Sequence, residues 1–247
     1  MPVETPITDL VAQLRRAGLR PNERLVKQIL DHGAEAIDPL LALACAIALL
    51  DEAEPLCWGP LHAARLLGEL MNADIATTLL DMLPIEVDDP DAPTPHKHWG
   101  IDIFQLIGRG GAALIPLLWA RADDPARDEL SRAATLETLP FITASAPESR
   151  DELIAAAHSR LAQEKNPIIN AYLVKLLASL GAQQYYSEIM TLYRTKRVNS
   201  DYFPAATARQ ALLSGGDKQL KCTLHSFWER YDEHGPFPAE FEEDDYA

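Results

Sequence analysis

The sequence is poor in the residues that stabilise small secreted domains and thiolate metal sites. It contains three cysteines, Cys45, Cys57 and Cys222, and none of them belongs to a CxxC pair. An odd number of isolated cysteines argues against a disulfide framework and against a zinc site built from thiolates. Glycine is also scarce, with 12 residues in 247, and no stretch alternates apolar and polar residues between hairpin turns. A β-sheet protein is therefore not expected.

A long apolar run and a surplus of positive charge are also missing. The longest apolar run, PLLALACAIALL, is shorter than the roughly 20 residues that span a bilayer. The start, MPVETPITDL, lacks the basic and then apolar pattern of a secretory signal. The 37 Asp and Glu residues outnumber the 22 Lys and Arg residues, and the resulting net charge of −15 repels phosphate backbones. We therefore expect a cytoplasmic protein that binds neither membranes nor nucleic acids.

Apolar residues recur at helical spacing along most of the chain, and the pattern is clearest over Leu61–Leu83. Small and large apolar residues lie on one face on both sides of a hinge at residues 71–74. This spacing predicts two short amphipathic helices that form a hairpin.

Similar hairpins recur along the sequence. The expected second helices begin near isoleucines that are 38, 40, 39 and 35 residues apart: Ile37, Ile75, Ile115, Ile154 and Ile189. Gly33, Gly111 and Gly181 come shortly before three of these helices. A hairpin of this length cannot cover its own apolar face, so neighbouring hairpins must stack on one another.

The segments AARLLGELMNADIATTLLDML and RAATLETL resemble HEAT repeats, and most of all the short variety found in phycobilisome lyases. The resemblance covers about residues 33–213. It implies an all-α fold, a right-handed α-solenoid of about five to six HEAT-like hairpins whose second helices line a concave face that commonly binds proteins. We expect this solenoid over residues 1–228, with irregular helices at 7–31 and a loop insertion at 84–98. Within it, Pro140 is expected to end a helix and residues 143–148 to form a loop.

The remaining residues, 229–247, are expected to form a separate C-terminal tail. They contain eight acids and one arginine, together with the aromatic residues Tyr231, Phe237, Phe241 and Tyr246. The aromatic residues distinguish this tail from a purely solvating acidic segment. We interpret it as a segment that folds back onto the concave groove or onto a basic run, or that mediates self-association.

The expected loop at 84–98 contains weak candidates for metal ligands, namely Asp88, Asp89, Asp91, His96 and His98. A His-x-His pair beside carboxylates offers the nitrogen and oxygen ligands of a divalent ion. The alternative is a solvated acidic loop whose histidines pack near Trp99. We favour this alternative because a metal site needs rigid, convergent ligands.

Exposed aromatic residues and the one dense basic run are the candidates for partner binding. Aromatic residues are enriched at interface hot spots, and Trp58 and Trp99 each precede the first helix of a repeat. The basic run is Arg194-Thr195-Lys196-Arg197. It would contact phosphates or an acidic segment, unless its cations simply stabilise a helix C-terminus. The full set of candidates is Trp58, Trp99, Tyr185, Tyr186, Arg194, Lys196 and Arg197.

No convergent catalytic set is visible in the sequence. Cys57 and His62 are close in sequence, but the acidic residues before them disfavour an activated thiolate. The glycine-rich turn at 108–111 lacks the pattern of a phosphate-binding loop. We therefore expect a non-enzymatic protein-interaction module or scaffold without a cofactor. The alternatives are a lyase-type, bilin-related enzyme on a HEAT-like scaffold and a metal-binding accessory protein.

Overall fold

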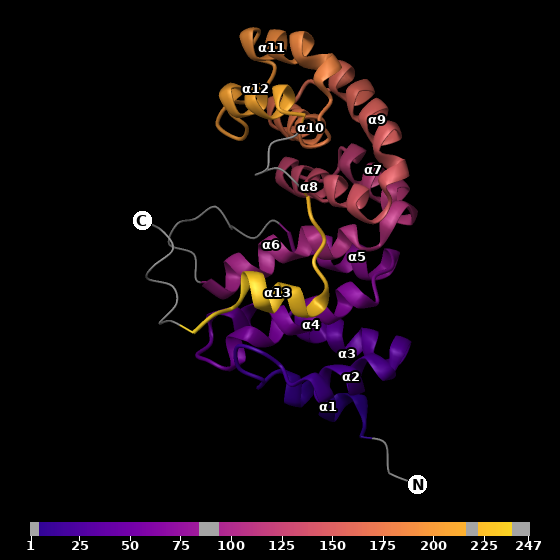
Figure 1. Ribbon diagram of the computed structural model, residues 1–247, viewed down its shortest axis with the longest axis vertical. Coiled ribbons are helices and arrows are strands. Elements are labelled where there is room, and N and C mark those ends of the chain that lie inside the picture. The colour runs from indigo at the N-terminus through magenta and orange to yellow at the C-terminus, as the bar shows by residue number, and fades with distance from the viewer. Residues whose placement is uncertain (1–4, 84–93, 216–221, 239–247) are drawn as a thin grey trace. The chain divides into compact units, whose positions relative to one another are not determined.

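The computed structural model describes residues 5–83, 94–215 and 222–238, and all their regular secondary structure is helical (Figure 1). This confirms the predicted all-α class. The chain divides into two compact units. Unit 1 contains Met1–Leu106 and His225–Ala247, and unit 2 contains Ile107–Leu224. Unit 1 is thus assembled from two separate stretches of sequence.

Unit 1 consists of short helices arranged around α3 and α4. Helix α3 packs on α4, while α1 and α5 pack against α3 and α13 packs against α4. The elements of this unit are α1 (Ile7–Leu14), α2 (Glu23–Asp31), η1 (Gly33–Ala36), α3 (Ile37–Ala44), η2 (Ile47–Asp51), η3 (Leu56–Trp58), α4 (Gly59–Glu69), α5 (Ala73–Asp81), most of α6 (Thr94–Gly108) and α13 (Phe227–His234).

Helix α6 contacts the centre of unit 1 through its apolar residues. The Trp99 side chain is fully buried, and its Nε1–H donates a hydrogen bond to the Ala44 carbonyl at 3.0 Å. Gly68 of α4 leaves space for Leu106, because a Cβ atom at position 68 would lie 2.5 Å from Leu106 Cδ2. The missing side chain therefore permits the close approach of α4 and α6.

Unit 2 is a succession of helix pairs. Helix α8 packs against α7 and α10, and α10 in turn packs against α9 and α12. Helix α11 also packs against α12. The elements of this unit are η4 (Gly111–Leu114), α7 (Ile115–Asp123), α8 (Glu129–Ser145), η5 (Pro147–Ser149), α9 (Arg150–Gln163), α10 (Pro167–Ser179), η6 (Gln183–Tyr185), α11 (Tyr186–Arg194) and α12 (Ala205–Leu213).

Polar side chains join successive helix pairs of unit 2 at a regular interval. Arg160 donates to Asp123 at 2.7 Å, and the two residues are 37 positions apart. The Asn166 side-chain amide donates to Glu129 at 2.8 Å, again across 37 positions. The Lys175 ammonium donates to Glu137 at 2.5 Å across 38 positions. These three links therefore share nearly the same spacing in sequence.

The glycines that precede three of the predicted second helices occupy equivalent turns. Gly33, Gly111 and Gly181 have φ values of 55°, 67° and 65°. Side chains other than hydrogen are disfavoured in this left-handed region. A short 3₁₀ turn follows each glycine and leads into α3, α7 or α11. The three glycines thus share a backbone conformation that favours glycine.

Three helices begin at asparagine side chains that accept backbone N–H groups. Asn22 accepts from Arg24 at the start of α2, and Asn72 accepts from Asp74 and Ile75 at the start of α5. Asn166 caps α10 in the same way. These caps satisfy N–H groups that have no partner within the helix.

The structure differs from the predicted boundaries around Pro140. Helix α8 continues through Pro140 to Ser145, so most of the expected loop at 143–148 is helical or 3₁₀ turn. Proline has a φ compatible with a helix and removes only one N–H group. Leu139 and Ile142 are fully buried on either side of it, so core packing holds the helix together.

The expected loop at 84–98 also has a different boundary. Residues 94–98 already belong to α6, in which Pro95 occupies the first turn, where a missing N–H has no helical partner to lose. Residues 84–93 lie outside the described part of the chain.

No single helix in the described ranges combines the length and apolarity needed to cross a membrane. One bent pair, Thr94–Gly108 with Gly111–Asp123, satisfies length and composition only when its two helices are taken together.

Candidate functional site

Helix α13 is the part of unit 1 that comes from the end of the chain. It lies over α4 and α6 (Figure 1). Ser226 and Glu229 form a capping box at its start, so the helix has a well-defined first turn. Residues 229–234 are therefore helical and packed within unit 1, which differs from the predicted separate tail. Residues 239–247 of that tail lie outside the described residues.

A buried cluster of charged side chains connects α13 to α4 and α6. Arg65 Nε donates to Asp102 Oδ2 at 2.6 Å, and Arg230 Nη1 lies 3.6 Å from Asp102 Oδ1. Arg230 also donates to Gln105 Oε1 at 3.0 Å. All three charged residues are at most 2% exposed. One carboxylate thus pairs with two buried guanidinium groups, and removing it would leave two buried cations without an anion.

The same cluster fixes the residues that follow α13. Arg65 Nη1 donates to the Gly235 carbonyl at 2.7 Å, and the Arg65 guanidinium lies 4.3 Å from the centre of the Tyr231 ring. A cation over an aromatic face is attracted by the ring quadrupole. Arg65 therefore contacts both the last turn of α13 and the chain beyond it.

His62 forms a second buried polar contact with α13. Its Nε2 lies 2.7 Å from the Gly18 carbonyl and its Nδ1 lies 2.7 Å from the Tyr231 hydroxyl. Since a carbonyl only accepts hydrogen bonds, Nε2 carries the proton and Nδ1 accepts from the tyrosine. Burial is the largest cause lowering the pKa of His62 to about 4. The imidazole is therefore neutral near pH 7.

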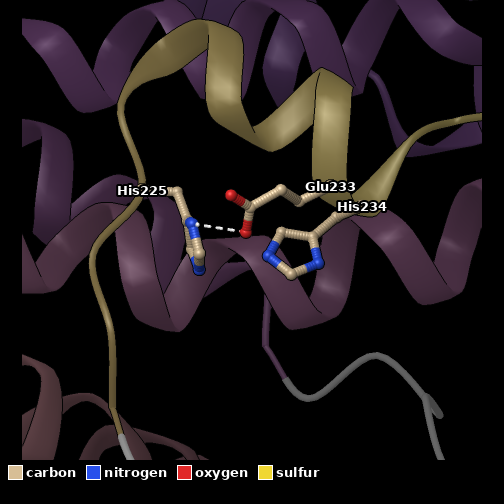
Figure 2. Close-up of side chains that lie close together, drawn as sticks. All are labelled: His225, Glu233 and His234. Atoms are coloured by element: carbon tan, nitrogen blue, oxygen red, sulfur yellow. Dashed lines mark ion pairs between the residues drawn. The ribbon is translucent and has the colours of Figure 1, made fainter.

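Two histidines and a glutamate converge beside α13 (Figure 2). His225 immediately precedes the N-cap of α13, whereas Glu233 and His234 lie in its last turn. One ligand atom from each residue lies within 4.8 Å of the other two. His225 Nδ1 is 3.1 Å from Glu233 Oε2, and the two imidazole centroids are 4.6 Å apart.

Two of the weak candidates for metal ligands, His96 and His98, lie in the described part of the chain. His96 Nε2 lies 3.6 Å from Asp51 Oδ1, whereas His98 packs edge-on against the Trp58 ring. The two histidines thus have different neighbours. The other weak candidates, Asp88, Asp89 and Asp91, lie outside the described residues.

The two tryptophans predicted to bind a partner are buried. Trp58 is 4% exposed and Trp99 is 0% exposed. Their indole N–H groups donate within the protein, to Glu54 and to the Ala44 carbonyl. The predicted surface role of both residues was therefore wrong, because each ring fills the core of unit 1 and each polar atom already has a partner.

The predicted tyrosines and basic residues lie in unit 2 and have different degrees of exposure. Tyr185 is half-buried and stacks on His158 with centroids 3.8 Å apart, and Tyr186 is also half-buried. Arg197 donates to the Glu164 carbonyl at 2.8 Å, next to the end of α9. It therefore has a structural contact that satisfies a helix C-terminus. Arg194 and Lys196 are exposed.

A shallow hollow of about 540 Å³ lies in unit 2, where α7 leads into α8 and α9 leads into α10. The three large apolar residues that line it are at most 2% exposed, and charged side chains of both signs surround them. The lining residues used below are Leu136, Ile169 and Leu173 on the floor, and Asp123, Arg132, Arg160, Gln163, Glu164 and Lys165 on the rim.

The sequence pair Cys57 and His62 does not form a nucleophilic site. His62 uses both ring nitrogens for Gly18 and Tyr231. Burial, reinforced by the charge of Glu54, raises the pKa of the Cys57 thiol. A thiol with a raised pKa is less ionised and therefore a weaker nucleophile near neutral pH.

The cluster around α13 was missed from sequence because its members are distant in the chain. The one local signal was the amphipathic segment FWERYDEH, whose Phe227 and Tyr231 are four positions apart and are both buried. Comparisons of the chain with protein-family models, with curated proteins and with solved structures give no match.

Proposed function

We propose that this chain is a HEAT-like helical-repeat module that binds a protein or peptide and does not catalyse a reaction. The observation that carries the proposal is the regular spacing of the links between helix pairs in unit 2. In a repeat array, equivalent positions of neighbouring repeats face each other, so their contacts recur at one repeat length. The links made by Arg160, Asn166 and Lys175 recur at 37, 37 and 38 positions.

The packing order of the helices supports the same proposal. The first helices of successive pairs, α8, α10 and α12, contact one another in a row. Each also contacts the second helix of the preceding hairpin, through the contacts of α7 with α8, α9 with α10 and α11 with α12. Extended surfaces formed by such rows are well suited to binding another chain.

The hollow in unit 2 is the surface we assign to the partner. Its floor, formed by Leu136, Ile169 and Leu173, is at most 2% exposed, so polar side chains provide most of the accessible surface. An extended peptide would place apolar side chains over this floor and polar groups against the rim. Binding sites of this kind combine apolar contact with a few oriented polar groups.

The charges of the rim favour an acidic partner. Arg160 pairs with Asp123 at 2.7 Å and Arg132 pairs with Glu164 at 2.8 Å. The exposed Lys165 then gives the rim an excess of one positive charge. The chain as a whole carries a net charge of −15, so this locally positive rim contrasts with its surroundings. Opposite charges at a rim steer association and select partners.

A site-specific photocrosslinker tests the proposal. We would place benzoylphenylalanine at Gln163, an exposed residue of the rim, in the full chain. Peptides of about twelve residues, selected from a random library on the wild-type chain, would then be crosslinked and mapped. We expect enrichment of peptides with mixed acidic and apolar residues, and crosslinks at position 163.

Charge reversal provides the matched control. Lys165→Glu should weaken the selected peptides by about tenfold or more, whereas Lys27→Glu, at an exposed lysine of unit 1, should leave their affinity unchanged. A short single-stranded oligonucleotide should not bind. The proposed site would be contradicted if both variants lost the same affinity for the peptides. It would also be contradicted if the peptides crosslinked only to a probe placed at position 27.

A further inference from the structure

The side chains of His225, Glu233 and His234 have the composition of a transition-metal site. Two imidazoles and one carboxylate are ligands that Zn²⁺ accepts, whereas Mg²⁺ and Ca²⁺ prefer oxygen ligands alone. Figure 2 shows the carboxylate between the two rings, with a dashed line joining it to His225.

One of the distances between ligand atoms already matches that of a tetrahedral ion, and the others have an upper limit of 4.8 Å. Zinc–ligand bonds of about 2.0–2.1 Å place neighbouring ligand atoms about 3.3 Å apart. His225 Nδ1 and Glu233 Oε2 are already 3.1 Å apart, and all three ligand atoms lie within 4.8 Å of one another. Small side-chain rotations would therefore complete the ligand geometry.

The backbone beneath the three side chains is held from both ends of α13. Ser226, next to His225, forms the capping box with Glu229. Arg230 and Tyr231, which precede Glu233 and His234, are 1% and 3% exposed and contact α4 and α6. Ligands on such an anchored helix lose little freedom when they bind an ion.

We propose that His225, Glu233 and His234 bind one divalent ion of the zinc class, with water completing the coordination. This site is separate from the proposed peptide-binding hollow, which lies in unit 2. The ion would connect the segment before α13 to the last turn of the helix. Metal binding would therefore stabilise α13 in its packed position.

Competition with a chromophoric zinc chelator tests the site on the full chain without a histidine tag. We expect one equivalent of Zn²⁺ to bind to the wild-type chain. His234→Gln should weaken binding by about 100-fold or more, because even outer-shell changes cost about 10–100-fold. Glu233→Gln should also weaken it. Both side chains are largely exposed, so these variants should fold.

His158→Gln is the matched control because His158 also faces a glutamate, Glu188, at 2.8 Å, but belongs to no group of three ligands among the described residues. It should bind Zn²⁺ like the wild type. Co²⁺ should give visible absorption bands with the wild-type chain and with His158→Gln but not with His234→Gln. Absence of a stoichiometric wild-type site, or equal binding by all variants, would overturn the proposal.

Discussion

Tyr231 and His62 are 169 positions apart in sequence, yet the tyrosine hydroxyl and His62 Nδ1 are 2.7 Å apart in the interior of unit 1. The bond links the last helix to the centre of α4. The phenol is fully buried, and burial is the main cause that raises the pKa of Tyr231. The hydroxyl therefore remains protonated and available as a donor at neutral pH.

We predict that Tyr231→Phe destabilises the protein by about 1–3 kcal/mol. The substitution keeps the ring that faces Arg65 but leaves His62 Nδ1 buried without its donor, and an unsatisfied buried acceptor carries a cost of this size. Urea denaturation of the full chain measures the change. Tyr202→Phe is the control, since Tyr202 is 41% exposed. Equal midpoints for the two variants would contradict the prediction.

The stability of unit 1 should fall between pH 6.5 and pH 4. His62 has an ordinary pKa of 6.5, which burial lowers to about 4 in the folded chain. Between these values the unfolded chain binds a proton at His62 and the folded chain does not. The neutral His62 therefore makes its full contribution to the free energy of unfolding above pH 6.5. Acidification decreases this contribution by up to about 3 kcal/mol.

Denaturation midpoints measured from pH 7 to pH 4 test this dependence. His98 and His234 also have lowered pKa values, chiefly because of burial, and they contribute with the same sign. His62→Gln should therefore reduce the slope without abolishing it. A slope that is the same in the variant and the wild type would exclude His62 as a major cause.

Asp102→Asn should destabilise the protein by about 3–5 kcal/mol, because it leaves Arg65 and Arg230 buried without their shared anion. The matched control is Asp232→Asn. Asp232 pairs with Arg20 at the surface, where its side chain is 58% exposed, so its loss should cost less than about 1 kcal/mol. Chemical denaturation measures the free energy of unfolding of both variants. Similar decreases in the two variants would contradict a stabilising role of the buried cluster.

Gly181→Ala should destabilise unit 2 more than Gly111→Ala does. Both glycines have a left-handed backbone, with φ values of 65° and 67°. A Cβ atom at position 181 would lie 2.7 Å from the Gly215 carbonyl oxygen, whereas one at position 111 would lie 3.7 Å from its nearest neighbour. We expect about 1 kcal/mol for Gly111→Ala and at least about 2 kcal/mol for Gly181→Ala. Denaturation midpoints of the two variants measure this difference, and equal midpoints would contradict the prediction.

The helical class and the equivalent turns were predictable because their signals are local. Gly33, Gly111 and Gly181 each precede a helix by a few residues, and their left-handed backbone conformation favours glycine. The periodic isoleucines marked the same helices. Neither signal depends on which distant segment covers the helix.

The environment of α13 could not be predicted in the same way. Three acids and an arginine among eight residues suggest a solvated segment, and only the partners contributed by α4 and α6 make Arg230 suitable for burial. Trp99 shows the same limit, because the Ala44 carbonyl that accepts its indole N–H is 55 positions away. Such pairings follow from tertiary packing and leave no trace in local periodicity.

The discontinuity of unit 1 has a consequence during synthesis. His62, Arg65 and Asp102 leave the ribosome before all of Ile107–Leu224, whereas Arg230 and Tyr231 emerge after it. At a synthesis rate of about 5–20 residues per second, α13 is made several seconds after His62, Arg65 and Asp102. A chain cut short before that helix would contain Arg65 and Asp102 without Arg230 and Tyr231, so the interior of unit 1 is completed only after α13 has been synthesised.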